Sequence, residues 1–174
     1  MTEEITINIP HELEHPFFFL AKEKLIVERM ALQTMNVNIP FLYEAAYYSG
    51  IDAMKPWEMK EECIPLVISE WKKIKSTLDE LFLNRNYKQA LEPMKKGISL
   101  LLEFIYWANE SPVQFFEADF INKLAFRPVN IGERLSFIIE RPAFYHSFIQ
   151  LSELMVEMEK QYVKKLAVKK ASKQ

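Results

Sequence analysis

Glycine is scarce in this chain, which has only three among its 174 residues. Because glycine most easily supplies the positive φ angles of tight β-hairpins, this scarcity argues against an all-β fold. Gly50, Gly97 and Gly132 also lie far apart, which excludes a glycine-rich phosphate loop of the P-loop or Rossmann kind. Hydrophobic residues make up 49% of the chain and aromatic residues 13%, so the sequence can bury a sizeable core. We therefore expect a mainly helical protein, and nothing in the sequence indicates a cofactor.

Cysteine, net charge and long apolar runs are equally limited. Cys63 is the only cysteine, which excludes an internal disulfide framework and predicts a buried thiol in a reducing compartment. The 22 basic and 24 acidic residues give a net charge of −2, so the whole chain does not attract nucleic acid or an anionic membrane. No apolar run approaches the roughly 20 residues that span a bilayer, and the N-terminus is acidic where a secretory signal is basic. These features predict a cytoplasmic protein without a membrane partner.

The length of the chain and the positions of its helix-breaking residues predict one compact all-α domain. A chain of 174 residues fits a single hydrophobic core. Residues 1–16 are acidic and contain two prolines, so we expect an extended lead-in on the surface. Residues 17–166 are predicted to form the helical domain, with about six to eight helices that end in a long amphipathic helix. Residues 167–174 are predicted to form a basic, frayed tail.

Apolar residues recur at helical spacing through most of this domain. The expected helices cover 17–35, 40–49, 65–83, 86–109 and 113–125, followed by one that starts at Asn130 and a long one that opens at Pro142. Asn86 with Gln89, and Asn130 with Glu133, have the spacing of a capping box. The long helix carries a stripe that we interpret as core-facing, formed by Phe144, Phe148, Leu151, Met155, Met158 and Tyr162.

The segment His11-Glu12-Leu13-Glu14-His15 matches the HExxH pattern of zinc proteases. That chemistry places both histidines on one face of a helix, with the glutamate as general base. Pro10 and Pro16 enclose the segment, and Pro16 disfavours helical geometry at His15. We therefore predict no metal site here.

A second pattern joins Arg141 to His146. This R-x4-H arrangement resembles that of the HEPN ribonucleases, in which a histidine acts beside an arginine that stabilises phosphate charge. Pro142 follows the arginine, where that family usually has a polar residue. We assign no catalytic site and keep these two residues only as candidates. In the alternative interpretation, His146 is a partly buried side chain near a helix start.

The C-terminal end is rich in lysine. Lys164, Lys165, Lys169 and Lys170 are candidate contacts to the phosphates of a nucleic acid, in a nonspecific and salt-sensitive mode. In the alternative interpretation, they solubilise the chain and complement the negative C-terminal end of the helix dipole.

The stretch VNIGERLSFIIERPAFYHSFIQLSEL, from Val129 to Leu154, resembles the YpoC-like family of small bacterial proteins. The resemblance rests on an N-x-x-E-R-L start and a Y-x-S-F-x-Q-L helix. It implies a compact helical protein of unassigned function, encoded near DNA replication and repair genes, and it brings no catalytic residues. Within the stretch, the capping box does not explain Arg134, His146 and Gln150, which are therefore candidates for lining a polar binding groove.

Without a catalytic motif, the sequence predicts a noncatalytic helical module that binds a protein partner, with a role beside DNA replication or repair implied by the resemblance. The aromatic clusters at 41–48 and 104–107 are candidate surfaces for that partner, unless they belong to the core. The alternatives are a nucleic-acid accessory protein that acts through the lysine-rich end and a HEPN-like RNase that uses Arg141 and His146. A homodimer is compatible with each of these functions.

Overall fold

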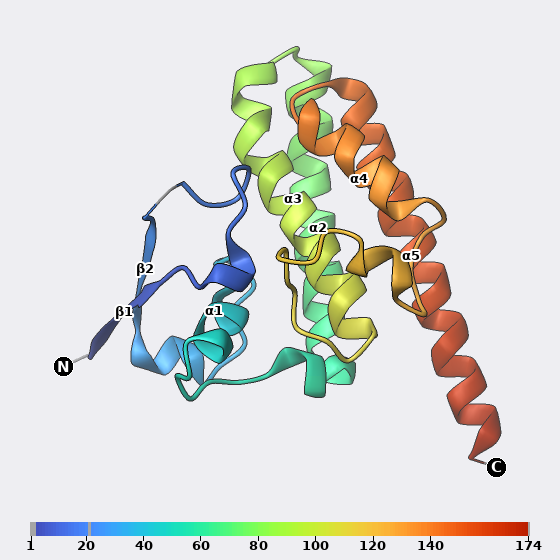
Figure 1. The fold of residues 1–174 in the computed structure, drawn as a ribbon. Helices are drawn as coiled ribbons and strands as arrows, with labels where there is room; N and C mark the ends of the chain where they lie inside the picture. The colour runs from blue at the N-terminus through green and yellow to red at the C-terminus, as the bar shows by residue number, and fades with distance from the viewer. Residues whose placement is uncertain (1–2, 21, 174) are drawn as a thin grey trace.

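The computed structural model describes residues 3–20 and 22–173, which fold into two layers (Figure 1). We call residues 3–58 the N-terminal layer and residues 60–172 the helical layer. The predicted helical class is confirmed, with five α-helices and four short 3-10 turns in the described part of the chain. A small two-stranded sheet, which the helical spacing does not predict, completes the fold. No helix in the described ranges is long and apolar enough to cross a membrane.

The N-terminal layer begins with this sheet. β1 (Glu4–Asn8) pairs antiparallel with β2 (Lys24–Glu28) in a register that sets Ile7 opposite Leu25. Alternate residues of a strand face opposite sides, so Ile7 and Val27 are buried while the other face meets solvent. The sheet is therefore anchored to the rest of the protein through one face.

Two expectations for this layer differ from the structure. The lead-in predicted for residues 1–16 is more regular than expected, since its described part holds β1 and the 3-10 turn η1 (His11–Leu13). The helix predicted over 17–35 is wrong, because that range holds β2 and a second 3-10 turn, η2 (Arg29–Leu32). The apolar residues of β2 also fit helical spacing, but pairing with a strand distant in sequence decides their conformation.

α1 (Leu42–Tyr48) lies within the range that the spacing predicts. Gly50, just beyond its end, has a φ of +71°. The amide of Gly50 donates to the Tyr47 carbonyl at 3.2 Å, and the amide of Ile51 donates to the Ala46 carbonyl at 2.9 Å. These are the two bonds of a Schellman motif, so the predicted glycine cap is confirmed.

Four longer helices form the helical layer. After the 3-10 turn η3 (Pro56–Glu58), α2 (Lys60–Leu83) and α3 (Tyr87–Ala108) run side by side along most of their length. α4 (Ile131–Glu140) and α5 (Tyr145–Ser172) then pack on one another, and α5 also contacts α3 and α2. Each of these four helices lies where the apolar spacing predicts one.

The helix starts after Asn86 and Asn130 are correctly predicted, but their capping boxes are absent. Neither asparagine side chain bonds to an amide of the helix that it precedes, and Asn130 has a φ of +54°. The amide of Gly132 in α4 instead donates to Asn122 Oδ1 at 3.1 Å. A Cβ at position 132 would lie 2.6 Å from the Asn122 side chain, so only glycine leaves room for this cap. The cap thus comes from a distant residue, which a local pattern does not reveal.

The helix predicted over 113–125 is also wrong. That range is largely irregular and contains only the 3-10 turn η4 (Phe120–Lys123). The side chain of Asn109 holds the loop that follows, because it accepts a bond from the Phe126 amide at 2.9 Å and donates to the Phe126 carbonyl at 2.7 Å. Such contacts satisfy backbone groups that a helix would pair internally.

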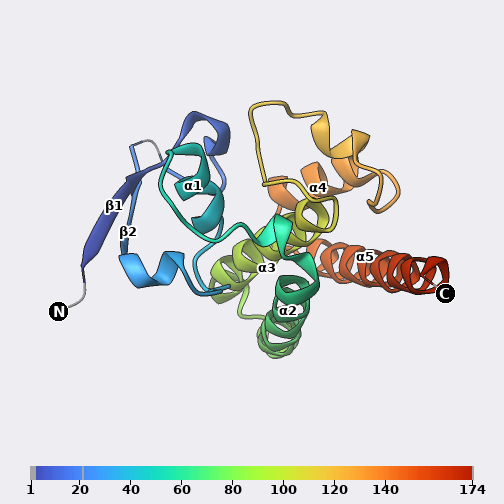
Figure 2. The same cartoon turned by 90° about the horizontal axis from the view of Figure 1, so that it is seen from below.

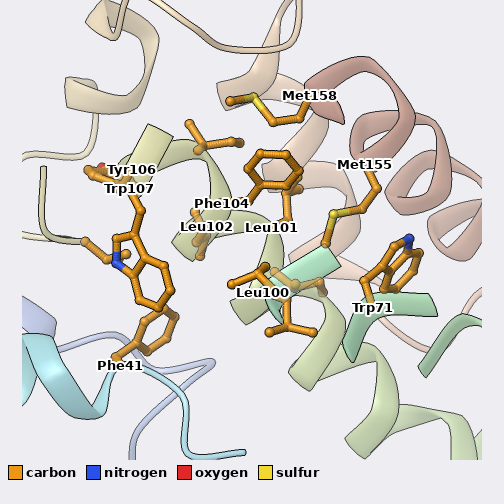
Figure 3. Close-up of a cluster of buried hydrophobic side chains, with 14 of the residues drawn as sticks. Phe41, Trp71, Leu100, Leu101, Leu102, Phe104, Tyr106, Trp107, Met155 and Met158 are labelled. Atoms are coloured by element: carbon orange, nitrogen blue, oxygen red, sulfur yellow. The ribbon is translucent and has the colours of Figure 1, made fainter. Parts of the chain in front are cut away.

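One hydrophobic core spans both layers. Figure 3 shows Phe41 of the N-terminal layer beside Trp107 of α3, and Met155 of α5 beside Trp71 of α2. All four side chains are buried. Cys63 is buried in the same core, as predicted, and burial raises the pKa of its thiol to about 11.

The aromatic clusters at 41–48 and 104–107 belong to this core. Tyr47, at 45%, is the only side chain in the two clusters that the structure leaves exposed. The clusters therefore offer no contiguous apolar surface to a partner.

The apolar stripe of the last helix faces the core, as predicted, from Phe148 to Tyr162. Phe144 precedes the helix and is 52% exposed. α5 continues to Ser172, so most of the segment that was expected to fray is helical. In both views the C-terminal end of α5 projects past the rest of the fold (Figure 1 and Figure 2).

Candidate functional site

The residues singled out around the YpoC-like signature do not form one groove. Arg134 of α4 donates through Nε to Gln150 Oε1 of α5 at 3.1 Å. Its guanidinium also lies 2.9 Å from the Glu157 carboxylate and 4.0 Å from that of Glu153. This cluster ties α4 to α5 and occupies the donors of the arginine. His146 is exposed and forms no hydrogen bond with these residues in the described part of the chain.

Arg141 and His146 are both exposed and face different neighbours. The Arg141 guanidinium lies 5.5 Å from the centre of the Phe144 ring, and the His146 ring centre lies 6.4 Å from that of Tyr145. Among the described residues, neither a hydrogen bond nor an ion pair joins the arginine to the histidine. Within one chain, the geometry therefore supplies no support for their acting together.

The lysine-rich end is partly engaged within the fold. Lys165 donates to the Ala108 carbonyl at 2.9 Å and lies 3.9 Å from the centre of the Phe126 ring. Burial is the main cause that lowers the pKa of Lys165 to about 8. Lys169 forms an ion pair with Glu61 at 2.6 Å. Two of the four lysines considered as phosphate contacts are thus bound to the protein itself.

The histidines of the HExxH segment lie in different surroundings. His11 is exposed, with its Nδ1 3.5 Å from the Glu14 carboxylate. The His15 ring packs against Phe18 and Phe115, at centre separations of 5.2 and 5.1 Å, and burial lowers its pKa. Across the ranges that the structure describes, no group of three potential ligands is placed to hold a metal.

Two completely buried carboxyl groups join the layers, and no sequence pattern pointed to them. Glu103 of α3 accepts a hydrogen bond from the amide of Phe41 at 3.1 Å. Glu44 of α1 accepts bonds from Trp107 Nε1 at 2.8 Å and from the amide of Val113 at 3.2 Å. We call these two glutamates the carboxyl pair. Each keeps one oxygen without a hydrogen-bond partner among the described residues.

Burial controls the charge of the carboxyl pair. It raises the pKa of Glu44 to about 7, against hydrogen bonds that favour the ionised form. Burial also raises the pKa of Glu103 well above its usual value, and the charge of Glu44 adds to this effect. The pair therefore retains a proton near neutral pH, so at least one of the two buried carboxyl groups is uncharged.

A groove with a cavity volume of about 560 Å³ opens between the two layers, and we call it the interlayer groove. Such a volume lies within the range of small-molecule and segment-binding sites. Its apolar walls come from both layers and comprise Phe18, Phe19, Leu25, Pro40, Ile74 and Pro93. Its polar lining comprises Glu23, Asn38, Glu70, Lys73, Thr77, Glu92, Lys95, Lys96 and Ser99.

An ion-pair network fixes one edge of the interlayer groove. Lys96 of α3 lies 2.8 Å from Glu70 of α2, and Lys73 lies 3.8 Å from the same carboxylate. Lys96 Nζ also donates to Asn38 Oδ1 at 3.2 Å, which links the helices to the N-terminal layer. Lys95, in contrast, forms no ion pair with any described residue and is available to a ligand.

The groove continues into two adjoining hollows. One shares Phe19 and Glu23 with it and extends along the loop between the strands. The other shares Asn38, Glu70 and Lys73 and extends along α2. The combined surface is elongated, and three lysines balance three glutamates in the groove itself. It therefore has no net charge that would select an anionic ligand.

Sequence reasoning missed the groove because its walls come from segments far apart in the chain. One local signal was present. The run Phe17-Phe18-Phe19 follows Pro16 and fits neither helical nor strand periodicity, and such a run indicates aromatic residues placed by tertiary contacts.

Comparison with known proteins identifies the family. A sequence profile described as YpoC-like protein matches residues 61–170. The chain is 34% identical, over 138 residues, to a Bacillus subtilis (strain 168) protein whose title is "Uncharacterized protein YpoC". That alignment covers 78% of this chain and 80% of the relative. No solved structure matches the chain. The family signature that the sequence suggested is confirmed, and the chain belongs to the YpoC-like protein family.

Proposed function

We propose that this protein is a noncatalytic interaction module that binds an apolar segment of a partner protein in the interlayer groove. The observation that carries this proposal is the groove itself, which combines aromatic and aliphatic walls with a charged rim. Binding sites for short protein segments have this character, because apolar anchors supply affinity and rim charges fix orientation.

The shape and charge of the groove favour a protein segment over a small anionic metabolite. Its elongation through the adjoining hollows suits a chain that lies along it. Because lysines and glutamates are balanced, a phosphate-rich ligand would meet repulsion as well as attraction. A segment with apolar side chains and charges of both signs matches the lining.

The proposal can be tested at Thr77, an exposed residue of α2 that lines the groove. A photoactivatable benzoylphenylalanine at this position should crosslink a partner in lysate of the native host. The same group at Ser76, which is exposed but lies outside the groove lining, should not crosslink that partner.

The captured partner then allows a quantitative measurement by calorimetry. Thr77→Trp fills part of the groove from an exposed position, so we expect it to weaken binding at least tenfold without unfolding the protein. Ser76→Trp is the matched control and should leave the dissociation constant unchanged. Equal affinity of the two variants would show that the partner binds elsewhere.

A further inference from the structure

The outer face of α5 carries a second apolar stripe, which is partly exposed at Ile149 and exposed at Val156 and Val163. Ile149, Val156 and Val163 are spaced seven residues apart, so they lie on one side of the helix. Val156 is 49% exposed and Val163 is 59% exposed. Buried residues such as Leu151 and Met158 occupy the opposite side. We call Ile149, Val156 and Val163 the outer stripe.

Shallow hollows flank Val156 along this face. One is lined by Ile149, Ser152, Glu153, Val156 and Glu157. The next is lined by Val156, Glu159, Lys160, Val163, Lys164 and Ala167. The outer stripe is therefore a continuous, grooved surface of about four helical turns, which is the form of a helix-pairing seam.

The charges beside the outer stripe change sign along the helix. Glu153 and Glu157 lie in its N-terminal half, where Arg134 of α4 pairs with Glu157 at 2.9 Å and approaches Glu153 to 4.0 Å. Lys160 and Lys164 lie in its C-terminal half. Two glutamates beside one arginine leave the N-terminal half with a net negative charge. All four residues of α5 lie on the same flank of the stripe, because they are spaced four, three and four residues apart. In an antiparallel pair related by a two-fold axis, this flank of one helix faces the same flank of the other helix. The acidic half of each helix then lies against the basic half of its partner.

We propose that two copies of this chain associate through the outer stripe, with their α5 helices antiparallel and Val156 of one copy beside Val163 of the other. In this register Glu153 lies within one helical turn of Lys164 of the other copy, and Glu157 lies within one turn of Lys160. This register therefore packs Val156 against Val163 and sets the net negative half of one helix beside the basic half of the other.

The same charges argue against other occupants. An anionic membrane would attract the lysines but repel the glutamates, and a nucleic acid would do the same. A parallel pair of α5 helices would turn this flank away from the same flank of the other copy, so the glutamates would not meet the lysines. A single helix-to-helix contact buries less than the roughly 1,600 Å² of a standard interface, so we expect association in the micromolar range.

Sedimentation equilibrium of the full chain tests the association. The wild type should pass from monomer to dimer as its concentration rises through the micromolar range, and Val163→Glu should remain monomeric. Val168→Glu is the matched control, because Val168 is 62% exposed on the same helix but lies off the stripe. A wild type that stays monomeric near millimolar concentration, or equal dimerisation of Val163→Glu, would overturn the proposal.

Cysteine pairing tests the antiparallel orientation. A mixture of Val156→Cys and Val163→Cys proteins should form a mixed disulfide dimer on oxidation, whereas either protein alone should not. In the antiparallel register, identical positions lie about 10 Å apart along the axis, beyond the roughly 7 Å limit for bridging Cα atoms. Wild type, whose Cys63 is buried, serves as the blank. Efficient disulfide formation by Val156→Cys alone would contradict this antiparallel register.

A charge exchange tests the recognition between the halves. Lys164→Glu should weaken dimerisation by about fivefold, and adding Glu153→Lys to it should restore part of that loss. Lys72→Glu makes the same charge change on the exposed side of α2 and should have no effect. Equal affinities for Lys164→Glu and the double variant would show that the flanking charges do not recognise one another.

Discussion

The two layers of this protein are held in place by different forces. The helices of the helical layer pack through long apolar stripes, such as the buried run from Phe148 to Tyr162. The N-terminal layer shares their core, but it is also positioned by desolvated polar contacts to Glu44 and Glu103. Buried apolar area therefore stabilises the helical layer, and a few buried polar groups position the N-terminal layer against it. The interlayer groove lies along that junction.

The largest effect on stability should come from a cavity in the helical layer. Leu151 is completely buried and lies close to Gly97, where an added Cβ would approach it to 3.0 Å. Leu151→Ala should therefore lower the free energy of unfolding by about 3 kcal/mol, measured by chemical denaturation. We expect one transition for both layers. A loss below about 1 kcal/mol would contradict tight packing of α3 on α5.

The second largest effect on stability should fall mainly on the N-terminal layer. Glu44→Ala leaves Trp107 Nε1 and the Val113 amide without their acceptor, which should cost about 2 kcal/mol. Hydrogen exchange should then accelerate in α1 more than in α3. Glu58→Ala removes an exposed glutamate from the same layer and should change neither. Equal acceleration in both helices would show that the layers open together.

The pH dependence of stability should follow the carboxyl pair. The folded protein holds the proton of Glu44 up to about pH 7, whereas an unfolded glutamate releases its proton near pH 4.5. Stability due to this raised pKa is complete at low pH and is lost as the pH rises through the folded pKa. Burial also raises the pKa of Glu103 well above its usual value, which adds to this loss of stability. Stability of the wild type should therefore fall as the pH rises from 4.5 through about 7.

Glu103→Gln should reduce this pH dependence. The glutamine can still accept the Phe41 bond, and it removes a titrating carboxyl group whose pKa burial and the charge of Glu44 raise. The variant should exceed the wild type in stability at pH 8, and the difference should shrink at pH 5. The lowered pKa of His15 acts in the opposite direction but cancels in this comparison. Parallel stability curves for the two proteins would contradict a retained proton.

The smallest effect should come from the link between α4 and α5. Arg134→Ala removes contacts to Gln150 and Glu157 and should lower stability by about 1 kcal/mol. Arg141→Ala is the control, since that arginine is exposed and touches only the face of Phe144 among aromatic rings. If both variants lost the same stability, the cluster around Arg134 would have no structural role.

What could be predicted from sequence follows the same division. Helical spacing predicts the helices of the helical layer because their stability depends on apolar faces that recur with local periodicity. It fails over 17–35, where β2 depends on pairing with β1, and over 113–125, where distant side chains hold an irregular loop. The capping boxes fail for a related reason, since Asn122 caps α4 from outside the local pattern.

The site was harder to predict than the fold. Glu44 and Glu103 look like ordinary surface glutamates in the sequence, and they are buried only when distant segments of the chain assemble around them. The interlayer groove likewise exists only after β2, α2 and α3 assemble. The family match covers residues 61–170, which leaves the N-terminal wall of the groove outside it.

Native-state hydrogen exchange of α1 and α3 in wild type and Glu44→Ala tests the two-layer account most directly. We expect the amides of Leu42–Tyr48 to open at a lower free energy than those of Tyr87–Ala108 in the wild type. We also expect Glu44→Ala to widen the gap between the two helices. If α1 and α3 opened at the same free energy in the wild type, and also did so in Glu44→Ala, this result would contradict a separately stabilised N-terminal layer.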